Sequence, residues 1–212
     1  GLMPITVAAG QLGVSSSLVH VWVQHGVLQH DQHRQASRVW VRLNADDLAR
    51  EVVLPGREAW KEVVAAFGVD ILQTDQNLDR QKLRTLIFNQ PEARKRLESI
   101  IHPRVRALAE ERIRQYGAAG YPVVIYEVPL LFEGNLQEWL RPVILVACNI
   151  EAQTARLRKR DHLTTADAEK HIAAQMSLAE KRRLADYVIE NNGSLADLER
   201  QTREVLEKLK AT

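Results

Sequence analysis

The fold class is decided by the sequence VVIYEVPLLFE at residues 123–133. It opens with a continuous apolar run, and two similar runs follow it, VILV at 143–146 and YVI at 187–189. Continuous runs of aliphatic and β-branched residues are typical of parallel strands that are covered on both faces. The sequence therefore predicts an α/β fold with a mostly parallel sheet and flanking helices.

The segments between these runs carry the periodicity of amphipathic helices. Apolar stripes at helical spacing occur in residues 83–87, 97–101 and 195–209. Two helix starts are marked by a capping box or a close variant of one, at Ser177–Glu180 and at Ser194–Asp197. Strands that alternate with such helices agree with the α/β class.

Composition narrows the kind of protein. The 212 residues are 45% apolar and 26% charged, as in a globular domain, and the net charge of +2 implies no particular partner. No apolar run is long enough to span a membrane, so we expect no membrane partner. The lone cysteine, Cys148, cannot form an internal disulfide and is expected to be a buried core residue. A reducing compartment follows, and we expect a cytoplasmic location.

Residues 4–43 have a different texture and resemble a small helix-turn-helix module of DNA-binding regulators. Thr6 can cap a helix that ends near Leu12, and Gly13 can form the turn. Ser15 can then cap a second helix that ends near Gly26. This order is typical of a DNA-binding helix-turn-helix, and a plain helical hairpin is the alternative.

If this segment binds double-stranded DNA, its polar side chains divide by role. Those expected to face base edges are Ser16, Ser17, His20 and Gln24. Those expected to meet phosphates are Arg34, Arg38 and Arg42. Nearby histidines have no Cys or acidic partner at regular spacing, so no metal site is expected.

After residue 43 the chain contains several short motifs in a fixed order. The longest is the acidic segment NADDLAREVVLPG at residues 44–56. The others are Phe67-Gly68, Leu78-Asp79-Arg80, Ile101-His102-Pro103, Val128–Glu133, Arg160-Asp161, Ala174-Gln175, Lys181-Arg182 and Ile189–Gly193. Through these motifs, residues 45–212 resemble the dephospho-CoA kinase family, and the resemblance implies a P-loop kinase-like parallel sheet with flanking helices.

The resemblance also implies a reaction with two substrates and a role in it for several residues. The family transfers the γ-phosphate of ATP, with Mg²⁺, to the ribose 3′-hydroxyl of dephospho-CoA. Asp46 matches the aspartate that accepts the hydroxyl proton, although an aspartate before a helix can also be an N-cap. Arg160 matches the lid arginine that reaches the transferring phosphoryl group, while Arg156, Arg158 and Lys159 can equally form a solvated face. Asn44 stands where the family usually has a second aspartate.

The other implied site residues form two groups. Those implied to bind dephospho-CoA are His102, Pro129, Leu131, Glu133 and Gln175. Those implied to bind the nucleotide cofactor are Asn191, Asn192 and Gly193. His102 can also be a histidine at a helix end.

One motif of the family is missing. A P-loop reads G-x-x-x-x-G-K-[ST], and none of the ten glycines is followed by Lys. We therefore expect residues 1–43 to form the helix-turn-helix segment. Residues 44–212 are then a kinase-like domain without its first strand, P-loop and first helix, although residues 39–43 can serve as the second strand. ATP binding and turnover should be severely impaired. The alternatives are a DNA-binding protein fused to a kinase remnant, or an inactive chimera.

Overall fold

The computed structural model describes residues 3–9, 41–121 and 123–210, with the backbone alone for residues 3–9 and 210. The chain forms two compact units. One contains Gly1–Arg42 and Tyr116–Thr212 and is called the sheet unit below. The other contains Leu43–Gln115 and is called the helical unit.

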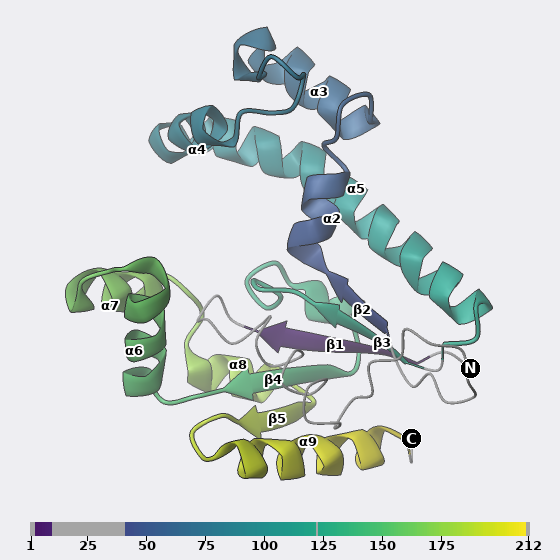
Figure 1. Cartoon of the computed structure of the whole chain (residues 1–212), viewed down its shortest axis with the longest axis vertical. Coiled ribbons are helices and arrows are strands. Elements are labelled where there is room, and N and C mark those ends of the chain that lie inside the picture. The colour runs from purple at the N-terminus through teal and green to yellow at the C-terminus, as the bar shows by residue number, and fades with distance from the viewer. Residues whose placement is uncertain (1–2, 10–40, 122, 211–212) are drawn as a thin grey trace. The chain divides into compact units, whose positions relative to one another are not determined.

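The sheet unit is built on a five-stranded sheet with the order β2-β3-β1-β4-β5 (Figure 1). Strand β1 pairs in parallel with β3 and with β4, and β4 pairs in parallel with β5. The strands predicted from the apolar runs that begin at residues 123, 143 and 187 are confirmed, as is the α/β class. The strands are β1 Met3–Ala9, β2 Val41–Asn44, β3 Val123–Glu127, β4 Val143–Ala147 and β5 Tyr187–Glu190.

Strand β1 overturns part of the N-terminal prediction. A helix was expected to start at Thr6, but Thr6 lies inside β1 and is paired with Tyr126 and with Val143. The expected loss of the first strand is also wrong, because β1 fills the centre of the sheet. The residues Ile5, Thr6 and Val7 are all β-branched, which favours a strand over a helix. The neighbouring parallel strands β3 and β4 supply hydrogen-bond partners for the backbone groups of β1.

The rest of the expected helix-turn-helix lies outside the described residues. This includes its turn, its second helix and all of its proposed DNA contacts before Arg42, namely Ser16, Ser17, His20, Gln24, Arg34 and Arg38. Only Arg42 is described, and it binds a carboxylate of the sheet unit.

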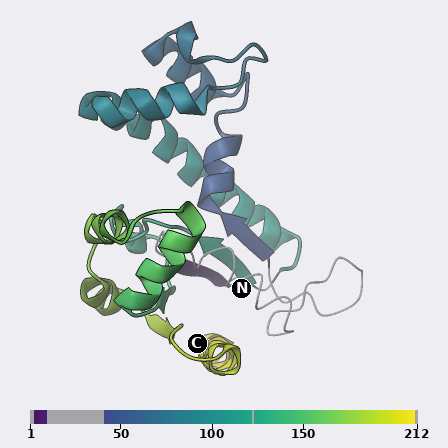
Figure 2. The same ribbon diagram turned by 60° about the vertical axis from the view of Figure 1, so that its left-hand side comes forward.

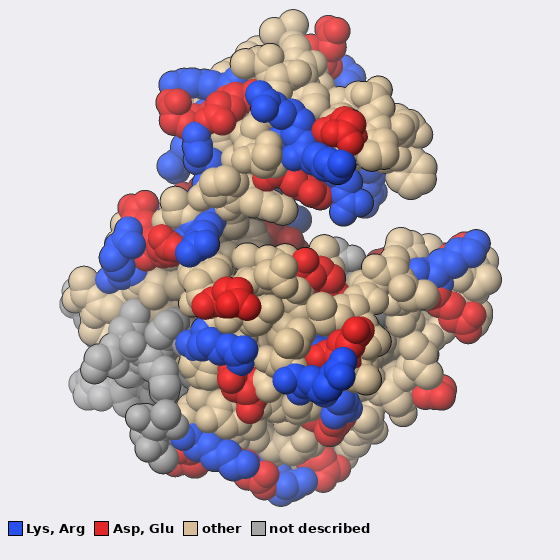
Figure 3. All heavy atoms as spheres, turned by 180° about the vertical axis from the view of Figure 1, so that it is seen from behind, with Lys and Arg blue, Asp and Glu red and all other residues tan. Residues whose placement is uncertain are grey.

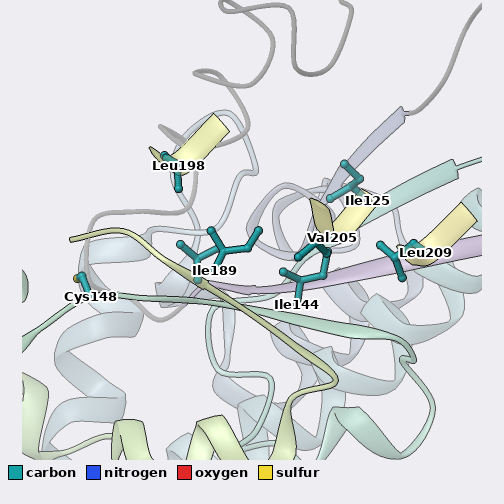
Figure 4. Close-up of a cluster of buried hydrophobic side chains, with 8 residues drawn as sticks. Ile125, Ile144, Cys148, Ile189, Leu198, Val205 and Leu209 are labelled. Carbon is teal, nitrogen blue, oxygen red and sulfur yellow. The ribbon is translucent and has the colours of Figure 1, made fainter. Parts of the chain in front are cut away.

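One face of the sheet packs on the C-terminal helix α9 (Leu195–Lys210). Side chains alternate along a strand, so Ile144 and Val146 of β4 point to the same face. They join Ile189 of β5 and the apolar stripe of α9, including Leu198 and Val205, in one buried cluster (Figure 4). The predicted amphipathic helix is confirmed.

The opposite face of β4 meets α8 (Leu178–Leu184). Leu145, which points away from α9, lines a cavity of about 330 Å³ together with Leu178 and Lys181. The predicted capping box is present at the start of α8, where Ser177 and Glu180 exchange hydrogen bonds. The similar pair Ser194 and Asp197 bonds at the start of α9 in the same reciprocal way.

Two further helices of the sheet unit, α6 (Ile150–Asp161) and α7 (Thr165–Ala173), pack against each other (Figure 2). Asn149 caps α6 by accepting a hydrogen bond from the backbone N–H of Ala152. Thr164 caps α7 by accepting one from Asp167. Three residues of the basic cluster, Arg158, Lys159 and Arg160, lie in the last turn of α6.

The helical unit consists of four helices around its own core. These are α2 (Ala45–Glu51), α3 (Glu58–Phe67), α4 (Arg80–Asn89) and α5 (Pro91–Ala118). Single 3₁₀ turns lie at Val69–Ile71 in this unit and at Leu136–Glu138 in the sheet unit. The predicted stripes of α4 and α5 are confirmed, since Leu83 and Ile100 are buried in one cluster with Val63 of α3.

Charged residues of both signs are interspersed on the surface, as the face in Figure 3 shows. Many are neutralised one helical turn away, as in Arg94–Glu98 and Arg106–Glu110. Among the described residues, no helix is both long and apolar enough to cross a membrane.

Candidate active site

Asp46 lies in the first turn of α2, directly after β2. The side chain of Asn44 caps this helix, because its Oδ1 accepts hydrogen bonds from the backbone N–H of Asp46 at 2.8 Å and of Asp47 at 3.3 Å. The alternative reading of Asp46 as the N-cap is therefore wrong. Its carboxylate is exposed and makes no hydrogen bond or ion pair within the described part of the chain. It is available to a ligand.

Asp46 contributes to the wall of an open pocket of about 770 Å³ within the helical unit, here called the arginine pocket. Its other walls come from α4, from the 73–79 loop and from Ile101 of α5. Three arginines also line it, Arg50, Arg80 and Arg84. The sequence motifs did not single out these arginines as a group, although the spacing of Arg80 and Arg84 was a usable signal, because residues four apart share a helix face.

His102 is not part of this pocket. It lies inside the 28-residue helix α5, so the reading as a helix-end histidine is wrong. Its side chain is exposed, and it is the preceding residue, Ile101, that lines the arginine pocket. A role for His102 in binding dephospho-CoA therefore has no support from the geometry of the helical unit.

In the sheet unit, Glu133 and Gln175 meet around a buried cation. Lys181 of α8 has a side chain that is 7% exposed, and its Nζ lies 2.8 Å from Glu133 Oε1. Gln175 Oε1 lies at the hydrogen-bond limit, 3.5 Å from the same Nζ. Glu133 Oε1 also accepts the backbone N–H of Met176 at 3.0 Å. Lys181 thus ties the loop after β3 to the segment that joins α7 to α8.

Two other residues implied to bind dephospho-CoA, Pro129 and Leu131, lie in the loop after β3 and differ in exposure. Leu131 is 1% exposed and belongs to the core, so it supports the loop from beneath. Pro129 follows the end of β3 and is half-buried. Carboxyl ends of parallel strands are where α/β sheets bind ligands, which makes Pro129 the better placed of the two.

Asn191 and Asn192 join the end of β5 to the end of β4. The N–H of Asn191 donates to the carbonyl of Ala147 at 2.6 Å. Asn192 Oδ1 accepts the N–H of Asn149 at 2.7 Å. At Gly193 a Cβ would lie 2.9 Å from Asp197 Oδ2, so a larger residue there would have to displace the Asp197 carboxylate. The three residues form one loop at the carboxyl edge of the sheet.

Arg156 reaches the same loop. Its Nη2 donates to the carbonyl of Asn191 at 3.1 Å, and its Nη1 is buried without a hydrogen-bond partner. The interpretation as a solvated face is therefore wrong for Arg156 and fits only Arg158 and Lys159, which are exposed.

Nearby Cys148 is buried, and desolvation raises the pKa of its thiol, which agrees with a core role.

Arg160 stands at the end of α6 and holds the next residue, Asp161. Its Nε donates to Oδ1 at 2.7 Å and its Nη2 to Oδ2 at 2.6 Å. These hydrogen bonds lower the pKa of the Asp161 carboxyl and raise that of Arg160. A phosphoryl group would have to share the Arg160 guanidinium with this carboxylate.

Comparison with known proteins agrees with the fold and the motifs. The dephospho-CoA kinase family model matches residues 32–197. A dephospho-CoA kinase of Geobacter sulfurreducens is 42% identical over 168 residues, which cover 79% of this chain and 85% of that protein.

Two solved structures share the fold. The crystal structure of TT1252 from Thermus thermophilus has a TM-score of 0.74 at 30% identity and covers 98% of both chains. A dephospho-CoA kinase from Campylobacter jejuni has a TM-score of 0.67 at 24% identity, covering 97% of this chain and 96% of that one. By the extent of the family match and the identity to its relatives, the chain belongs to the dephospho-CoA kinase family.

Proposed function

We propose that this chain binds dephospho-CoA through its helical unit and has little phosphoryl-transfer activity of its own. The family phosphorylates the ribose 3′-hydroxyl of dephospho-CoA with ATP. The observation that supports acceptor binding is the carboxylate of Asp46, which lines the arginine pocket and is not used by the fold.

Asp46 suits the role of proton acceptor. Because Asn44 caps α2, the Asp46 side chain is free to accept a hydrogen bond from the 3′-hydroxyl. Phosphoryl transfer depends on positioning and charge stabilisation, and a carboxylate orients the attacking hydroxyl. Asn44 itself supplies a cap and carries no charge for a metal shell.

The donor side is incomplete. ATP and Mg²⁺ in P-loop kinases are held by backbone N–H groups, a lysine and a hydroxyl of one loop. The sequence has no Gly-Lys pair. The P-loop motif that would hold a Mg²⁺-triphosphate group is therefore absent from the sequence, and no reaction step is assigned through that group.

The expected loss of rate is large. Removing a single preorganised donor costs about 10²–10³ in rate, and the P-loop motif that supplies several donors is absent from the sequence. Arg160 offers one cation that is already bonded to Asp161. We expect turnover far below the roughly 1–100 s⁻¹ that is typical of kinases.

Two measurements on the purified chain test the proposal. Calorimetry should detect dephospho-CoA binding, and a phosphate-transfer assay with excess ATP and Mg²⁺ should detect little product. Asp46→Asn should leave binding within about threefold, because it removes only the base. Absence of dephospho-CoA binding to the folded chain would refute the proposal. Turnover within about tenfold of the typical kinase range would refute the impairment.

The rival proposal is DNA binding through residues 4–43. It loses its first expected helix at β1, and nothing in the described residues favours it. A gel-shift assay with double-stranded DNA distinguishes the two, since acceptor binding alone predicts no shift.

A further inference from the structure

We propose that Arg50, Arg80 and Arg84 form a subsite for the diphosphate group of the acceptor, in the same pocket as Asp46. This rests on the proposed function, because it names the group by which dephospho-CoA would be held. Nothing in the family motifs quoted above assigns these three side chains a ligand.

Their charges are available. Arginines elsewhere in the helical unit hold carboxylates at short range, as Arg94 holds Glu98 at 2.8 Å and Arg112 holds Glu51 at 2.9 Å. Neither Arg80 nor Arg84 forms an ion pair or a side-chain hydrogen bond within the described residues. Arg50 has only Asp47 at 4.0 Å, a separation at the limit of an ion pair.

The helices aim the three groups at one space. Arg80 and Arg84 are four residues apart on α4, and Asp46 and Arg50 are four apart on α2, so each pair shares a helix face. All four line the arginine pocket. A planar guanidinium matches phosphate oxygens with two hydrogen bonds and stays charged at every physiological pH.

Asp79, an acidic residue in the same wall, does not neutralise the three arginines. Asp79 caps α4, and its Oδ1 accepts the backbone N–H of Gln81 and of Lys82 at 3.0 Å each. The only other acid in the wall is Asp46. Three guanidinium groups therefore face two carboxylates, one of which is engaged by the helix.

The chemistry of the acceptor matches this arrangement. Its 3′-hydroxyl and its 5′-diphosphate are attached to the same ribose. A pocket that offers a carboxylate to the hydroxyl must therefore hold the diphosphate close by. Arg50, one helical turn after Asp46, is placed for that, and the two α4 arginines extend the positive wall. The pocket of about 770 Å³ lies within the usual range for small-molecule sites, roughly 300–1,000 Å³.

Arg80→Gln and Arg84→Gln test the subsite by calorimetry with dephospho-CoA. Each should weaken binding about tenfold or more, since a charge-assisted hydrogen bond is worth about 1.5–3 kcal/mol. Inorganic diphosphate should compete with dephospho-CoA for the unaltered chain. Arg96→Gln is the matched control, because Arg96 is also exposed, has no described partner and lies outside the pocket. It should bind as the unaltered chain does.

Each outcome decides the matter. If dephospho-CoA binds and the pocket variants bind it equally well, the subsite is wrong and the proposed function stands. If the pocket variants weaken ATP binding and not dephospho-CoA binding, the diphosphate belongs to the donor nucleotide and the acceptor assignment falls. If the unaltered chain binds neither dephospho-CoA nor inorganic diphosphate, both the proposed function and the subsite are overturned.

Discussion

The sheet unit and the arginine pocket of the helical unit use their charged side chains in opposite ways. In the sheet unit, cations near the strand ends hold partners within the fold, as Arg42 holds Glu127 and Lys181 holds Glu133. In the arginine pocket of the helical unit, Arg80, Arg84 and Asp46 have no described partner. Charges that a fold uses are costly to remove, whereas charges left open are cheap to remove and are candidates for ligand binding.

The largest effect is expected at Arg42. Its Nε and Nη2 donate to Glu127 Oε2 at 2.9 and 2.6 Å, and the Glu127 side chain is fully buried. Arg42→Met should lower the free energy of unfolding by about 3 kcal/mol, because a buried carboxylate loses its cation. Urea unfolding followed by tryptophan fluorescence measures this. The double variant Arg42→Met/Glu127→Leu should recover most of the loss, and a single variant within about 0.5 kcal/mol of the unaltered chain would contradict the buried-pair argument.

A smaller effect is expected at Lys181, with its neighbour as control. Lys181→Met removes the buried cation that pairs with the Glu133 carboxylate. It should lower the free energy of unfolding by about 1–2 kcal/mol. Arg182 also holds a carboxylate, that of Glu190, but both side chains are 38% exposed. Arg182→Met should cost less than about 1 kcal/mol, since exposed pairs contribute little. Equal losses in the two variants would show that burial does not set the cost here.

In the arginine pocket, stability should hardly change. Asp46→Ala and Arg84→Gln should each stay within about 0.5 kcal/mol, because neither side chain has an intramolecular partner in the described chain. Asp79→Ala in the same wall should cost about 1 kcal/mol, because it removes the cap of α4. Thermal unfolding compares the three. A loss at Asp46 or Arg84 as large as that at Asp79 would mean that their charges serve the fold.

The smallest effect concerns the exposed pair at the end of α6. Hydrogen bonds from Arg160 hold the pKa of the Asp161 carboxyl below its ordinary value. A carboxyl with a lowered pKa stabilises the fold above its unfolded pKa, and the contribution is lost as pH falls through the folded pKa. NMR titration of the Asp161 carboxyl carbon should therefore place its midpoint below the ordinary value of about 3.9. Arg160→Gln should move the midpoint upward, and an unchanged midpoint would exclude the pairing in solution.

A feature could be predicted from the sequence where its signal lies within neighbouring residues. The runs at β3, β4 and β5 and the cap at Ser177 were predictable because strand and cap signals lie within a few adjacent residues. Strand β1 was misread, since Thr6 followed by a short apolar stretch also fits a helix start. Its β-branched residues were a signal, but only pairing with β3 and β4 decided between the two.

The candidate site shows the same division. The sequence by itself determined the family motifs, the carboxylate at Asp46 and the absence of a Gly-Lys pair, because these are facts of residue type and spacing. Tertiary structure alone decided that Asn44 and not Asp46 caps α2, and that Lys181 meets Glu133 across 48 positions of the chain. It also decided that Arg50 and Arg84 line one pocket. The reason is physical: which charge is paired depends on distances between segments, and a chain's local pattern does not contain them.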